Sequence, residues 1–248
     1  MIIQKLQEYV KGFMKNMNKE LIEAIFAVFD LENYAAENQR MRGVHDQGRR
    51  SGVTSGKHLD PLADYLAYEM ISAGIRENEV FTGSSNMEIP GWYRPNKQWD
   101  LLAFHNNALV NAIELKSIGS SYGNNFNNRT EEALGSATDV SAAVKYNMYN
   151  SIQPPAFGYV MIVKSDETSR RVINRIPEPH FCVDSVFYGN SYLDRFEIMC
   201  TRMLNERLYD AVWLVFVDVE NRTIEEPVRE LSYRNFIHRL KSNIELFL

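Results

Sequence analysis

Residues 99–132, WDLLAFHNNALVNAIELKSIGSSYGNNFNNRTEE, contain the stretch that decides the fold. Two apolar runs, Leu101–Phe104 and Ala108–Leu115, are separated by the polar triplet His-Asn-Asn. Short apolar runs joined by turn-forming residues are typical of a β-hairpin. We therefore predict two paired strands here, with the acid Asp100 at the start of the first.

Three charged side chains are predicted to meet at one end of this hairpin. The second strand ends with Glu114-Leu115-Lys116. Because side chains alternate between the two faces of a strand, Glu114 and Lys116 point to the same face. The hairpin pairing then brings Asp100 next to them.

Two carboxylates beside an ammonium favour metal-dependent hydrolysis of a phosphodiester. Mg²⁺ typically takes one or two carboxylates, water and a substrate phosphate. Asp100 and Glu114 would be the carboxylate ligands, and the backbone carbonyl of Leu115 a third ligand. Lys116 would orient a water or offset developing charge. A Glu-x-Lys tripeptide also arises by chance, but here it is the only Glu-x-Lys or Asp-x-Lys in the chain.

These residues resemble the PD-(D/E)xK nuclease pattern, with Trp99 in place of the usual proline. The surrounding sequence is similar to that of the XhoI-type family of type II restriction endonucleases. The resemblance runs from about residue 40 to about residue 220. The matching strings are PGWYRPNKQWDLL (90–102), AIELKS (112–117), GNNFNNRTEEALGSA (123–137), GKHLD (56–60), EPHFCVDSVFYGNSYLDRFEIMC (178–200) and ERLYDA (206–211).

The resemblance implies a restriction-endonuclease-like α/β fold, a mixed β-sheet core flanked by α-helices. It implies Mg²⁺-dependent, site-specific cleavage of double-stranded DNA that leaves 5′-phosphates. A palindromic site is most simply cut by a two-fold symmetric homodimer. If the specificity follows that of the family, the site is CTCGAG. A companion DNA methyltransferase is expected in the same system, but not as a stable subunit.

Two other functions stay open from the sequence. A nuclease of the same fold that acts on DNA structure, in repair or recombination, would keep the same three charged residues and cut at no fixed site. A DNA-binding module without catalysis would have the same acids merely solvated.

Length and composition set broader limits. The chain has 248 residues, 45% of them hydrophobic, and we predict one endonuclease domain over residues 1–248 with helical additions at both ends. We expect no membrane span and no signal peptide, and therefore a cytoplasmic location. The net charge of −5 argues against a protein that simply coats nucleic acid. Cys182 and Cys200 have no metal or disulfide spacing, so we expect free thiols.

Helices are predicted on both sides of a glycine- and arginine-rich segment. Residues 2–29 have apolar side chains at helical spacing. Asp60-Pro61 is a typical helix start, and Gly74 a typical stop. Glu69 lies near the inward stripe of this second helix. It either faces the metal site as a further catalytic residue or is a surface or salt-bridged acid.

Two segments are candidates for DNA contact. The segment 38–58 mixes arginine and glycine and is either a solvated loop or ordered by phosphates. The segment Ser117–Asn128 is predicted to be a loop, followed by a helix that begins near Asn128. Its asparagines either read base edges or simply make turns. The predicted DNA-binding residues are Arg42, Arg49, Arg50, Lys57, Asn124, Asn125, Asn127, Asn128 and Arg129.

Overall fold

The computed structural model describes residues 17–41, 57–83, 85–149 and 151–248. Its helices are α2 (Lys19–Met41), α4 (Asp60–Ser72), α5 (Tyr122–Lys145), α6 (Glu167–Arg170), α7 (Tyr192–Asn205) and α8 (Tyr233–Glu245). Short 3₁₀ turns are η1 (Lys57–Leu59), η2 (Glu77–Glu79), η3 (Ser185–Phe187) and η4 (Arg229–Leu231).

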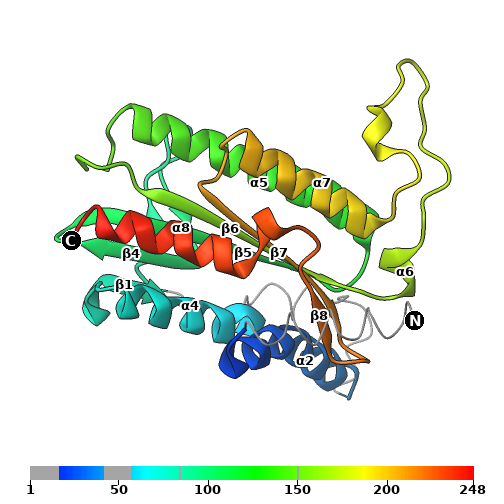
Figure 1. Cartoon of the computed structure of the whole chain (residues 1–248), viewed down its shortest axis with the longest axis horizontal. Coiled ribbons are helices and arrows are strands. Elements are labelled where there is room, and N and C mark those ends of the chain that lie inside the picture. Colours follow the sequence, from blue (N-terminus) through cyan, green and yellow to red (C-terminus); the bar gives the residue numbers. More distant parts are fainter. Residues whose placement is uncertain (1–16, 42–56, 84, 150) are drawn as a thin grey trace.

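A six-stranded mixed sheet forms the centre of the molecule (Figure 1). Its strands are β1 (Val80–Thr82), β4 (Leu101–His105), β5 (Ala108–Ile118), β6 (Ala156–Lys164), β7 (Ala211–Asp218) and β8 (Thr223–Glu225). The strand order is β1-β4-β5-β6-β7-β8, with β5, β6 and β7 parallel and the outer pairs antiparallel. A second sheet pairs β2 (Glu88–Ile89) with β3 (Lys97–Gln98). The predicted mixed sheet flanked by helices is confirmed.

Helices cover both faces of the sheet and define two hydrophobic cores. The core on one face contains side chains from α2, α4 and α8. The core on the other face contains side chains from α5 and α7. Figure 1 shows α5 and α7 side by side along one face, with α4 and α2 on the far side of the sheet. Strand β7 is buried on both faces, which explains its nearly continuous apolar sequence.

The predicted hairpin is confirmed as β4 and β5, whose pairing runs from Leu101–Ile113 to His105–Ala108. The turn consists of Asn106 and Asn107, both with positive φ (49° and 66°). A two-residue turn with two left-handed residues matches the right-handed twist of paired strands, and asparagine tolerates that conformation better than most residues. The turn sets the register as far as the Phe104–Leu109 pair, and a β-bulge between Ala103 and Phe104 then shifts it, so the turn and the bulge together place Asp100.

Several predicted boundaries are wrong. The segment Ser117–Asn128 is not a loop, because β5 continues to Ile118 and α5 begins at Tyr122. Tyr122 is buried and Phe126 packs edge-on against Phe196, so two aromatic side chains one helical turn apart anchor the start of α5. The expected cap at Asn128 therefore lies inside the helix.

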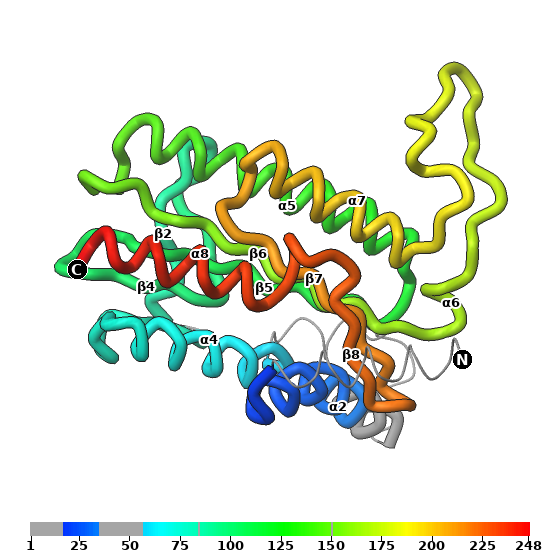
Figure 2. The backbone as a smooth tube through the Cα atoms, viewed as in Figure 1, coloured from blue at the N-terminus to red at the C-terminus, as the bar shows by residue number. Residues whose placement is uncertain are grey.

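The N-terminal region also differs. Helix α2 extends to Met41, beyond the predicted end at residue 29 and into the segment predicted to be a loop. The first part of that predicted helix, residues 2–16, lies outside the described residues. Helix α4 begins at Asp60 as expected, but its N-cap is Leu59 and has no side-chain cap. Between α6 and α7 the chain extends away from the body of the molecule (Figure 2).

Leu240 provides a test of the α8 contact with the sheet. It is fully buried, so Leu240→Ala should lower the free energy of unfolding by about 2–5 kcal/mol. The matched control is Leu246→Ala at the end of the same helix, where the side chain is 61% exposed and the change should stay within about 0.5 kcal/mol. Urea unfolding followed by circular dichroism measures both, and equal losses would contradict the burial of α8.

Candidate active site at the strand fork

The chain passes from the small β2–β3 sheet into the main sheet immediately before β4. The backbone N–H of Trp99 donates to the carbonyl of Met87 at 2.8 Å, so Trp99 follows the small β2–β3 sheet. The next N–H, that of Asp100, donates to the carbonyl of Ile113 at 3.1 Å. The β4–β5 register ends at the Leu101–Ile113 pair, whereas β5 stays paired with β6 as far as Ile118. The strands therefore fork at Asp100.

The carboxylate of Asp100 takes the place of the missing strand partner. Its Oδ2 accepts a hydrogen bond from the backbone N–H of Leu115 at 2.7 Å. The N–H and C=O of one strand residue point to the same side, so the Leu115 carbonyl is also directed towards the fork. Burial raises the pKa of Asp100, with the Leu115 hydrogen bond and the nearby Lys116 acting in the opposite direction.

Glu114 and Lys116 lie on the face of the sheet that α5 and α7 cover. They alternate along β5 with Ile113 and Leu115, which belong to the other core. The Lys116 Nζ lies 2.8 Å from Glu114 Oε1. The structure thus brings Glu114 and Lys116 together at the end of the hairpin where the Asp100 carboxylate also lies, as the spacing predicted.

A second lysine, not among the predicted site residues, completes this cluster. Lys97 Nζ lies 3.2 Å from Glu114 Oε2 and 4.3 Å from the centre of the Trp99 indole ring. Its side chain is only 9% exposed. Burial would raise the pKa of Glu114, but the charges of Lys116 and Lys97 together lower it. Burial also lowers the pKa of Lys97, although the charge of Glu114 opposes this.

Sequence reasoning missed Lys97 for an identifiable reason. It enters the site because β3 pairs with β2 through only two residue pairs, Glu88–Gln98 and Ile89–Lys97. Strands of two residues leave no hydrophobic alternation to detect. The available signal was the spacing of Lys97 and Trp99, two positions apart and so on one face of an extended chain.

The donor set suits a hard cation. Asp100 and Glu114 are two carboxylates beside the Leu115 carbonyl, and Glu114 Oε2 is buried without a hydrogen-bond donor. Mg²⁺ commonly takes only one or two protein carboxylates and fills its remaining positions with water and phosphate. Within the described residues, no group of three or more His, Cys, Asp or Glu side chains forms a site that holds a metal by itself.

Glu69 is not brought to this cluster. Its Oε1 accepts hydrogen bonds from the hydroxyls of Tyr65 (3.1 Å) and Tyr233 (3.0 Å), and Oε2 forms an ion pair with Lys241. These groups belong to α4 and α8, on the opposite face of the sheet from Glu114. The geometry matches the salt-bridged alternative for this residue.

The predicted DNA-binding residues fall into three groups. Arg42, Arg49 and Arg50 lie outside the described residues. Lys57 is exposed on η1, which is tied to the end of β5 by a 2.8 Å hydrogen bond between His58 Nε2 and Ser117 Oγ. The remaining candidates lie on the first two turns of α5, soon after β5.

The α5 candidates differ in their contacts. Asn124, Asn127 and Asn128 are exposed, and their spacing places them on one face of the helix. Asn125 donates its side-chain amide to the carbonyl of Ser120 at 2.7 Å, and Arg129 forms an ion pair with Glu132.

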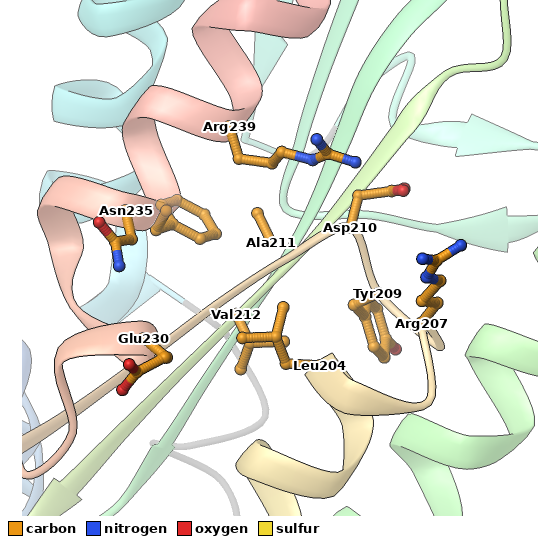
Figure 3. Close-up of a pocket in the computed structure, with 10 residues that line it drawn as sticks. Leu204, Arg207, Tyr209, Asp210, Ala211, Val212, Glu230, Asn235 and Arg239 are labelled. Carbon is orange, nitrogen blue, oxygen red and sulfur yellow. The ribbon is translucent and has the colours of Figure 1, made fainter.

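A separate cavity of about 580 Å³ opens beside the start of β7. It lies between the end of α7 and the start of α8, where Arg207 and Arg239 flank Asp210 (Figure 3). Strand β8 pairs only with Phe216–Asp218, so the first half of β7 has no neighbour on this side within the described sheet. None of the predicted site residues lines this cavity.

Comparisons with known proteins identify the class. The family described as restriction endonuclease XhoI matches residues 38–226. Similar curated proteins are the type II restriction enzymes BstVI of Geobacillus stearothermophilus and XhoI of Xanthomonas vasicola. BstVI is 36% identical, covering 80% of this chain and 92% of its own; XhoI is 39% identical, covering 71% of each. AbrI of Azospirillum brasilense is 34% identical over 64% of this chain and 71% of its own. No solved structure matches.

The fold and site thus define a chain of the restriction-endonuclease class. In particular, the chain belongs to the XhoI restriction endonuclease family. The family resemblance predicted from the sequence is confirmed. None of the helices in the described ranges is both long and apolar enough to cross a membrane.

The Glu69 contacts generate a pH-dependent prediction. Burial raises the pKa of this carboxyl, but Lys241 and the two tyrosine hydroxyls outweigh burial, so the pKa lies below its ordinary value. Glu69→Gln should therefore lower the free energy of unfolding by about 1 kcal/mol at neutral pH. The difference should be complete above about pH 5 and disappear as the pH falls through the lowered pKa. Urea unfolding at a series of pH values from 7 down to 2 measures this, and a difference that does not shrink as the pH falls below 5 would contradict it.

Proposed function

We propose that this chain is a Mg²⁺-dependent endonuclease that cuts both strands of a palindromic site in double-stranded DNA, leaving 5′-phosphates and 3′-hydroxyls. The observation that carries the proposal is the meeting of Asp100, Glu114 and Lys116 where β4 leaves β5. Membership of the XhoI family supports it.

The roles follow from the contacts of each group. Asp100, Glu114 and the Leu115 carbonyl would hold the Mg²⁺, which would polarise the phosphate and acidify a water. The lowered pKa of Glu114 keeps its carboxylate ionised at neutral pH. The side chain of Lys116 is 21% exposed and so is accessible to substrate. Its ammonium orients the attacking water and offsets the charge that develops on the phosphate.

DNA contact is proposed for the exposed residues next to the fork. Lys57 binds a phosphate, and Arg42, Arg49 and Arg50 are proposed to do the same. The exposed face of Asn124, Asn127 and Asn128 contacts base edges or phosphates, because an asparagine amide can bond adenine with two hydrogen bonds. Asn125 and Arg129 are proposed to hold this face in place through Ser120 and Glu132.

The finer specificity rests on the family resemblance. The proposed recognition site is CTCGAG, cut after the first C. Two copies of the chain related by a two-fold axis match the two half-sites of such a palindrome. A separate DNA methyltransferase protects the host site.

The active-site assignment predicts large losses of cleavage. Asp100→Asn and Lys116→Ala should each lower the rate of plasmid cleavage at least about 100-fold, because each removes a charge next to the scissile phosphate. The matched control is Asp210→Asn, since Asp210 likewise accepts a backbone N–H, that of Phe157, at the start of a strand. It should cut at nearly the wild-type rate.

The same assay tests the reaction class. Chelation of Mg²⁺ should stop cleavage and its return should restore it. Mapped ends should fall at one sequence and carry 5′-phosphates. Branch-dependent cutting without a fixed site would point to a structure-specific nuclease, and unchanged cleavage by Asp100→Asn or Lys116→Ala would remove the proposed active site.

The DNA-contact face has its own test. The double change Asn124→Ala and Asn128→Ala should weaken binding to cognate DNA at least about tenfold, because each bidentate contact contributes about 1–3 kcal/mol. Binding measured with Ca²⁺ in place of Mg²⁺ avoids cleavage. Asn205→Ala, at the exposed end of α7, is the control. Equal affinities for the double variant and this control would exclude the α5 face.

A further inference from the structure

The side chains of the fork form a charge-neutral group without any metal. Asp100 and Glu114 contribute two negative charges, and Lys97 and Lys116 contribute two positive charges. A divalent cation added to this group would leave two excess positive charges in a site that is largely closed to water. Like charges held close together in a partly buried site repel strongly.

Both oxygens of Glu114 already face an ammonium. Lys116 lies 2.8 Å from Oε1, and Lys97 lies 3.2 Å from Oε2. The side chain of Glu114 is 5% exposed, so little of it is open to a cation from solvent. A metal that binds Glu114 therefore competes with the ammonium beside the oxygen that it contacts.

The contacts single out Lys97 as the group that gives way. Its ion pair with Glu114 is the longer of the two, and its ammonium also donates a hydrogen bond to the backbone carbonyl of Gln98 at 3.1 Å. The side chain extends over the indole of Trp99, from a two-residue strand in the small sheet. Lys116, by contrast, is on the long central strand β5 and makes the shorter contact.

We propose that Lys97 is a tethered counter-ion that occupies the cation position beside Glu114 and is displaced when the divalent metal binds. The proposal rests on the proposed metal site at Asp100 and Glu114. In the metal-free protein Lys97 stabilises the buried carboxylate of Glu114. When the metal arrives, the ammonium moves towards solvent or towards the DNA phosphate, and the metal takes its place.

The first test measures metal binding without DNA. Calorimetric titration with Mg²⁺, repeated with Ca²⁺, compares wild type with Lys97→Met, which keeps the aliphatic stem over Trp99 and removes the charge. The variant should bind at least about tenfold more tightly, because the competing cation is gone. Lys145→Met is the matched control, since Lys145 also lies over an aromatic ring, that of Tyr146, but at the far end of α5.

A gain in affinity is not expected from a lysine that merely supports Glu114, whose loss would weaken metal binding. Equal or weaker binding by Lys97→Met overturns the proposal. Adding Asp100→Asn to the wild-type protein and to Lys97→Met tests the metal site separately from the displacement of Lys97. Loss of binding in the Asp100→Asn proteins, with no gain from Lys97→Met, would support the assigned metal site and contradict only the displacement of Lys97.

A second measurement uses the wild-type protein and needs no variant to fold. Acetylation of lysines by an activated ester, followed by mass spectrometry, reports the exposure of each ammonium. Saturating Ca²⁺ should increase the labelling rate of Lys97 severalfold and leave that of Lys145 unchanged. Labelling of Lys97 that is equally slow with and without Ca²⁺ would overturn the displacement.

Discussion

The hydrogen bond from the backbone N–H of Leu115 to the carboxylate of Asp100 is the constraint on which the site depends. Where β4 leaves β5, the strand would otherwise expose an N–H without a partner, and a buried unpaired N–H is costly. Asp100 satisfies that donor with a side-chain oxygen. The same bond holds the carboxylate of Asp100 near that of Glu114. The two carboxylates therefore meet at the point where β4 separates from β5.

The buried carboxylate of Glu114 needs opposite charges nearby, and the neighbouring residues supply them. An ionised carboxylate with almost no access to water needs opposite charges close by. Lys116 and Lys97 approach one oxygen each, from strands of different sheets. The Trp99 indole beneath Lys97 adds a favourable surface for its ammonium. The small β2–β3 sheet is thus part of the electrostatic structure of the site.

The sequence predicted the parts that depend on local pattern. The apolar runs around two asparagines predicted the hairpin, and the alternation of side chains along its second strand predicted that Glu114 and Lys116 share a face. Parts that depend on distant partners were not predictable. The asparagine-rich start of α5 is helical because Tyr122 and Phe126 pack on other elements. For Glu69, helical spacing identifies an inward side chain but not which face of the sheet the helix covers.

The connection between β5 and α5 consists of only three residues, Gly119, Ser120 and Ser121. Ser121 is in the left-handed region (φ 51°), and the side-chain amide of Asn125 donates a hydrogen bond to the carbonyl of Ser120. These two features constrain the conformation of the link. The first turn of α5 therefore stays close to Lys116, which lies two residues before the end of β5. The ammonium at the fork and the exposed asparagines of the helix are carried by one short, continuous segment of the chain.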